Sequence, residues 1–153
     1  MKELLEYRVK LIERLNQAAH EFCSACEAIS PIAIAEGDWT LHQMAAHVRD
    51  IDRVVYSARV RRTLAEENPL FESINPDDWM ADHYEKDEPL KKILSELQKN
   101  IYDLCRTTNQ LPVEAWSRQS RHETLGEGLT VQLWVERGLA HIEEHLNALK
   151  KLI

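Results

Sequence analysis

The chain has 153 residues, only 4 Gly and 5 Pro, and a formal net charge of −7. This length predicts a single domain, residues 1–153, that is large enough to bury a sizeable core. The negative charge argues against a sequence-independent nucleic-acid binder, because neutralising phosphates requires clustered Lys and Arg. The one basic cluster, Arg59–Arg62, falls on a polar helix face and is expected to be solvated.

The sequence predicts a soluble, reduced, cytoplasmic protein. Its first residues become charged too early for a signal peptide, and no apolar run approaches the roughly 20 residues needed to cross a bilayer. Three cysteines do not form a disulfide framework. Cys23 and Cys26 have CxxC spacing, but they continue the apolar stripe of a long helical pattern, so we expect buried thiols rather than a redox site.

Apolar residues at three- and four-residue spacing predict four helices, at about 3–29, 40–67, 89–106 and 130–152. Thr40 and Gln43 form a capping-box signature at the start of the second helix, whose buried stripe is expected to include Val55 and Ala58. Asp87 or Glu88 is the expected cap of the third helix.

No strand pattern is visible, and the connections 68–88 and 107–129 look irregular. The predicted fold class is therefore all-α, a four-helix bundle with two long connections that weaken the case for a simple up-down-up-down order.

Three histidines on two of these helices point to a metal site. His141 and His145 lie one turn apart on the last helix, and His47 lies on the second. Three imidazoles leave a divalent ion with an open position, as catalytic metals require. Helical angles place four further side chains at the edge of this site: Gln43, Asp50, Arg137 and Glu144.

The alternative is that these histidines are core residues with hydrogen-bond partners. Two imidazoles in one core stripe disfavour it, because each buried nitrogen needs a partner. His20 and His42 are expected at the surface, whereas His83 and His122 lie in the connections and could reach a substrate. No Glu-x-x-His pair or HExxH motif is present, and His141–His145 matches HxxEH in a chain too short for that peptidase class.

The chain resembles the DinB/YfiT-like superfamily of four-helix-bundle proteins over nearly its whole length. The resemblance rests on the order and spacing of short motifs: Trp39-Thr40, Gln43, His47 and Asp50, then Trp116, His122 and Gly126, then His141-x-x-x-His145. It implies one divalent metal ion on His47, His141 and His145, nickel or zinc first, with iron or manganese as alternatives. It also implies a homodimer.

Members of that superfamily include thiol S-transferases that use low-molecular-weight thiols, a thiol-dependent isomerase and metal-dependent hydrolases. The expected function is a metal-dependent enzyme acting on a small molecule, with a low-molecular-weight thiol as co-substrate in the transferase case. Asp50 and Glu144 are the candidate catalytic residues, either orienting an imidazole or moving a proton. The alternative is a non-catalytic, stress-related binding protein with a structural or vestigial metal site.

Overall fold

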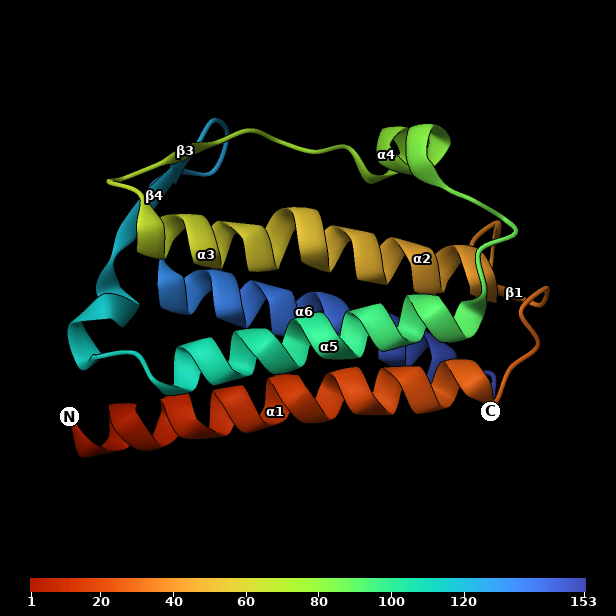
Figure 1. Ribbon diagram of the computed structural model, residues 1–153, viewed down its shortest axis with the longest axis horizontal. Coiled ribbons are helices and arrows are strands. Elements are labelled where there is room, and N and C mark those ends of the chain that lie inside the picture. Colours follow the sequence, from red (N-terminus) through yellow and green to blue (C-terminus); the bar gives the residue numbers. More distant parts are fainter.

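A computed structural model describes all residues, 1–153, and its frame is a bundle of four helical rods (Figure 1). The rods are α1 (Lys2–Glu27), the joined α2 (Leu41–Ile51) and α3 (Ser57–Ala65), α5 (Leu90–Asn109) and α6 (Val131–Lys150). Rods α1 and α6 run one way, whereas α2–α3 and α5 both run the other way, so the order is not up-down-up-down. The predicted all-α four-helix bundle is confirmed. None of its helices is long and apolar enough to span a bilayer.

Helix starts follow the capping residues of the sequence. Thr40 Oγ1 accepts the backbone N–H of Gln43 at 3.2 Å, and the Gln43 side chain accepts that of Thr40 at 2.8 Å, so the capping box is confirmed. Thr130 caps α6 in the same way, through the N–H of Leu133. The predicted cap of α5 was wrong: Pro89 occupies that position, and no side chain caps the helix.

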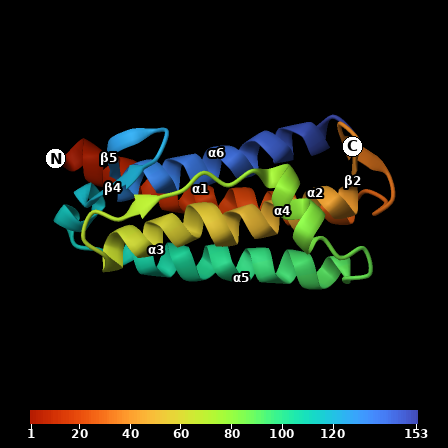
Figure 2. The ribbon, with the colours of Figure 1, turned by 90° about the horizontal axis from the view of Figure 1, so that it is seen from above.

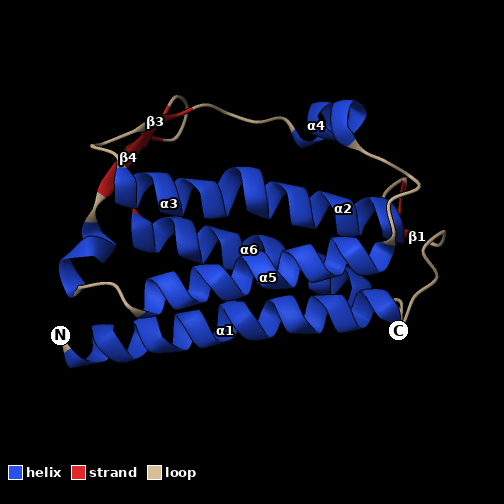
Figure 3. Ribbon diagram, in the orientation of Figure 1, coloured by secondary structure: helices blue, strands red, loops and turns tan.

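Short strands contradict the expectation of no β-structure. β1 (Ile34–Glu36) pairs with β2 (Trp39–Thr40), and β3 (Leu70–Phe71) joins β4 (Gln119–His122) and β5 (Gly126–Thr130) in a three-stranded sheet. Segments of two to five residues are too short to display the two-residue alternation of a strand, so the sequence pattern did not predict these strands. Red segments in Figure 3 mark strands at both ends of the bundle.

The second rod contains a π-helical segment, η1 (Asp52–Tyr56), that interrupts its α-helical pattern. A π turn takes in one extra residue and so shifts the positions that follow it. The expected stripe continued through Ala58, which is only half-buried, whereas Val60 and Thr63 are fully buried instead. The rod therefore presents two faces, one before η1 and one after it.

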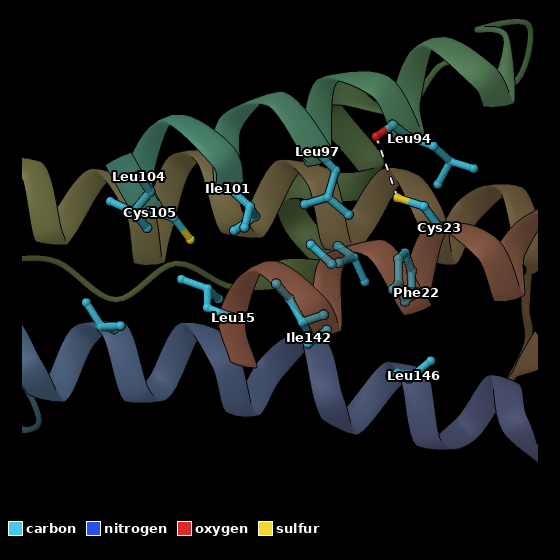
Figure 4. Close-up of a cluster of buried hydrophobic side chains, with 14 of the residues drawn as sticks. Leu15, Phe22, Cys23, Leu94, Leu97, Ile101, Leu104, Cys105, Ile142 and Leu146 are labelled. Carbon is cyan, nitrogen blue, oxygen red and sulfur yellow. Dashed lines mark hydrogen bonds between the residues drawn. The ribbon is translucent and has the colours of Figure 1, made fainter. Parts of the chain in front are cut away.

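Apolar side chains from α1, α5 and α6 fill the bundle core (Figure 4). Phe22, Leu97 and Ile142 have no accessible surface. Cys23 and Cys26 are free and buried among them, and burial raises the pKa of Cys23 to about 12. The expectation of buried, unreactive thiols is confirmed, because the thiolate is the reactive form.

A long strap, residues 66–89, carries the chain from α3 back along the second rod to α5 (Figure 2). It contains α4 (Pro76–His83), which lies over α2. The indole Nε1 of Trp79 on α4 donates to Asp50 Oδ2 on α2 at 3.1 Å. The last connection contains a 3-10 turn, η2 (Val113–Ser117), before the sheet. The strap thus covers the rod that carries His47.

Candidate metal centre

Three predicted histidines meet between α2 and α6. One nitrogen from each of His47, His141 and His145 can be chosen so that all three lie within 4.8 Å of one another. The Nε2 atoms of His47 and His141 are 3.1 Å apart. The three ring centroids are separated by 4.7 to 5.0 Å, with each pair of rings edge-on. The helical spacing therefore brings together the set that the sequence singled out.

Burial keeps two of these imidazoles neutral. It lowers the pKa of His47 to about 4 and that of His141 to about 3, and the neighbouring His145 lowers both further. Neutral imidazole nitrogens have the lone pairs that a metal ion needs. At neutral pH these two residues therefore present ligand atoms rather than charges.

The hydrogen bonding of the cluster is incomplete. The Nδ1 atoms of His47 and His141 are buried and have no hydrogen-bond partner. Two ligand nitrogens on one tetrahedral zinc ion, each about 2.05 Å from it, are about 3.3 Å apart. The 3.1 Å between the two Nε2 atoms is close to that value. The residues present thus fit a divalent ion, with adjustment of the third imidazole to complete the set.

A fourth residue, Glu36 on β1, completes the surroundings of His145. Its Oε2 lies 2.7 Å from His145 Nδ1. A carboxylate at one ring nitrogen fixes the imidazole orientation and leaves the other nitrogen free for a metal. Sequence reasoning missed Glu36, because it lies in a hairpin with no strand pattern, far from the helical spacing that located the histidines.

Two aromatic rings flank the cluster. The Trp39 ring centroid is 4.7 Å from that of His47, and the Tyr56 centroid is 5.4 Å from that of His141. Tyr56 comes close to α6 at Gly138, where an added Cβ would lie 3.2 Å from Tyr56 Cβ. Gln43 and Trp39 also line a pocket of about 410 Å³ beneath α4. Trp39 therefore lies between this pocket and His47.

The candidate catalytic carboxylates lie in very different surroundings. Asp50 is buried and accepts hydrogen bonds from Arg49, Arg53 and Trp79, with no hydrogen bond to an imidazole. Glu144 is exposed and has no hydrogen-bonded partner. Neither residue orients a histidine by direct contact, and that role falls to Glu36.

The other two predicted edge residues, and the histidines outside the cluster, also differ in their burial and hydrogen bonding. The Gln43 side chain is occupied in the capping box, and Arg137 is exposed. His20 is exposed as expected. His42 contradicts the expectation of a surface residue: it is buried, with Nδ1 2.6 Å from Tyr84 Oη and Nε2 2.6 Å from the Glu88 carbonyl oxygen.

The histidines of the connections differ from each other. His83 is exposed and stacks on Trp79, with ring centroids 3.7 Å apart. His122 is the last residue of the β4 strand and is buried. The expectation of a solvated basic cluster at 59–62 was wrong in part, because Arg59 is buried against Trp134 while Arg61 and Arg62 are exposed.

The backbone is similar to a solved structure, that of YfiT from Bacillus subtilis. The match has a TM-score of 0.84 and 21% sequence identity, and it covers 96% of this chain and 86% of that one. The chain has the YfiT fold. That structure is described as a probable metal-dependent hydrolase with an unusual four-helix bundle topology.

A scan of protein-family models and a search of curated proteins gave no match. At 21% identity the similarity shows the fold alone. The chemistry of this chain depends on its own side chains.

Proposed function

We propose that this protein is a hydrolase of a small molecule and that it uses one divalent metal ion held by His47, His141 and His145. The observation that carries the proposal is the convergence of three histidines, two of which, His47 and His141, are neutral and have a buried Nδ1 without a partner. The description of YfiT as a probable metal-dependent hydrolase supports it. We expect nickel or zinc first, with iron or manganese as alternatives.

When bound, such an ion acts as a Lewis acid and lowers the pKa of a water molecule from 15.7 toward about 7. The chain's own residues do the remaining work. Glu36 holds His145 in place, Trp39 and Tyr56 shield the histidines from bulk water, and the exposed Glu144 is the carboxylate free to exchange protons with solvent.

A thiol S-transferase is the second candidate, because the same three-histidine set supports it. A divalent ion with three neutral ligands also stabilises a thiolate, so a low-molecular-weight thiol would serve as co-substrate. The free cysteines of the chain cannot take this role, since all three are buried. The third candidate, a stress-related binding protein with a structural or vestigial ion, predicts a site without turnover.

The test begins with metal content, measured by mass spectrometry on tag-free protein and on the His141→Ala/His145→Ala variant. His20→Ala is the matched control, because it removes an exposed histidine outside the cluster. We expect about one equivalent of metal, lost in the double variant and kept in the control. Wild-type protein that takes up neither nickel nor zinc would contradict the proposal.

Assays on the metal-loaded protein then separate the reactions. Chromogenic esters and amides test hydrolysis, while conjugation of cysteine or glutathione to an electrophilic dye tests thiol transfer. Turnover of esters or amides that is lost in the double variant supports the hydrolase. Turnover that requires a thiol supports the transferase, and bound metal without turnover supports the binding protein.

We propose three further properties of this protein. The chain is proposed to be one domain, to act in the cytoplasm and to form a homodimer. Light scattering on a gel-filtration column would test the last, with an expected mass of twice the 17.8 kDa of one chain.

A further inference from the structure

Arg59 on α3 is a buried cation without a carboxylate partner. Only 8% of its surface is exposed. Its guanidinium lies 4.7 Å from the Trp134 ring centroid and 5.6 Å from that of Phe71, and Nη2 donates to the Glu72 carbonyl oxygen at 3.1 Å. The buried Arg49, by contrast, pairs with three acidic side chains. A buried charge is costly unless it is paired.

The guanidinium of Arg59 also keeps free donors. The similarly buried Arg8 uses both Nε and Nη1, on Gln132 and on the Val113 carbonyl oxygen. Arg59 uses Nη2 alone, and its Nε and Nη1 are not among the buried nitrogens sealed off without a partner. Arg59 also lines a pocket of about 400 Å³ between α3 and the strap. A ligand can therefore reach its unused N–H groups.

Two further donors surround Arg59. Arg137 follows Trp134 by one turn of α6, and the Trp134 ring centroid lies 4.7 Å from the Arg59 guanidinium. Burial lowers the pKa of Arg59, and the positive charge of Arg137 also lowers it. Arg137 forms no ion pair.

His122 Nδ1 accepts the backbone N–H groups of Thr124 and Leu125, at 3.1 and 3.2 Å, which leaves the ring proton on Nε2 as a donor. His122 is the β4 partner of Phe71, whose ring centroid lies 5.6 Å from the Arg59 guanidinium. Burial lowers the pKa of His122, and the charges of Arg59 and Arg137 also lower it.

This group of donors adjoins the candidate metal centre. Tyr56 lies against His141, and Arg59 is one helical turn beyond it on the same rod. On α6, Arg137 lies one turn before His141. Unpaired positive charge on α3 and on α6 thus lies one helical turn from residues of the candidate metal centre.

We infer that Arg59, Arg137 and His122 form an oxyanion subsite, which binds the carboxylate or phosphate group of the small molecule whose reacting bond lies at the three histidines. The inference rests on the proposed function for the position of that bond. The subsite itself rests on the buried, unpaired guanidinium and the donors beside it. Charge-assisted hydrogen bonds from these groups would select anionic over neutral substrates.

The experiment uses protein freed of metal, so that anion binding is measured independently of the ion. Inorganic phosphate and succinate are titrated separately, and backbone amide NMR shifts report binding. We expect saturable shifts around residues 56–59, 122 and 137. Tighter binding of phosphate assigns the group as a phosphate, and tighter binding of succinate assigns it as a carboxylate.

Arg137→Gln is the principal variant, because Arg137 is exposed and has no hydrogen-bonded partner. We expect it to weaken binding about tenfold, the value of one charge-assisted hydrogen bond. Arg61→Gln, an exposed arginine on the same helix as Arg59, is the matched control and should bind as wild type does. Arg59→Lys keeps a charge at the buried position while removing the guanidinium donors, and it too should weaken binding.

Failure of both anions to bind, or equal weakening by Arg61→Gln, would overturn the subsite. So would unchanged binding by Arg137→Gln. Metal content separates the two proposals: Arg137→Gln should keep the metal of the wild type, whereas the histidine variant loses metal and keeps anion binding.

Discussion

The Glu36 carboxylate lies 2.7 Å from Nδ1 of His145, and this contact joins the β1–β2 hairpin to the last helix. The hairpin lies between α1 and α2, so a residue more than a hundred positions away fixes the imidazole. The contact gives the third histidine a defined tautomer, with its second nitrogen available to a metal.

Glu36→Gln is expected to reduce metal affinity between about ten- and a hundredfold, because the amide is a weaker partner for the imidazole than the carboxylate. Competition with a chromogenic chelator measures the change. Asp38→Asn, at an exposed position in the same hairpin, is the control and should leave the affinity unchanged. Equal affinities for wild type and Glu36→Gln would remove Glu36 from the site.

Trp79→Phe should loosen α4 from the bundle, because it removes the indole donor to Asp50. A hydrogen bond to a charged group contributes about 1.5 to 3 kcal/mol, so we expect the amides of α4 to exchange hydrogen at least about tenfold faster. Hydrogen–deuterium exchange reads this directly. The amides of α5 serve as the internal control, and unchanged exchange in α4 would show that the indole is not its anchor.

Asp52 provides a prediction for pH. Burial raises the pKa of its carboxyl to about 6, although Asn100 and Ser57 donate to it. A raised folded-state pKa means that its contribution to stability is present below about pH 4 and is lost as the pH rises through 6. The loss amounts to about 3 kcal/mol for two pKa units.

Asp52→Asn therefore should raise the free energy of unfolding at pH 8, by up to about 3 kcal/mol, and change it little at pH 4. Urea unfolding at both pH values measures the difference. Asp82→Asn, at an exposed aspartate, should show no such dependence. A variant that is less stable than wild type at pH 8 would contradict this prediction. It would mean that the folded protein stabilises the ionised carboxylate of Asp52 more than a neutral side chain.

Gly138→Val tests the close approach of Tyr56 to α6. An added Cβ alone would lie 3.2 Å from Tyr56 Cβ, so a larger side chain must push the two rods apart. Overpacking of this kind costs about 1 to 3 kcal/mol. Ala140→Val, at an exposed position on the same helix, carries the β-branched penalty without the clash. Similar unfolding free energies for the two variants would contradict the packing argument.

Sequence reasoning located the rods and the histidines because both depend on helical spacing. His47, His141 and His145 are fixed by a single periodicity on helices with strong apolar stripes, and the structure brings them together. Glu36 could not be found in this way, since its position depends on a hairpin with only five strand residues. The sequence has no local signal for that hairpin.

The other incorrect predictions concern residues whose surroundings depend on contacts with distant parts of the chain or on an irregular helix. Helical angles placed Asp50 near His47, but the neighbouring Arg49 and the distant Trp79 take up its carboxylate. The burial of Arg59 followed from the π turn, which no propensity rule anticipates. His42 is buried because the end of the strap, at Tyr84 and Glu88, covers it.

The π-helical turn Asp52–Tyr56 divides the second rod into two lengths. The length before it positions His47, and the length after it positions Arg59. A π turn takes up one extra residue within about the rotation of one regular turn, so removing that residue would restore α-helix there and leave both lengths facing as they do now. The second rod can thus gain or lose one residue at this turn without changing the direction of either His47 or Arg59.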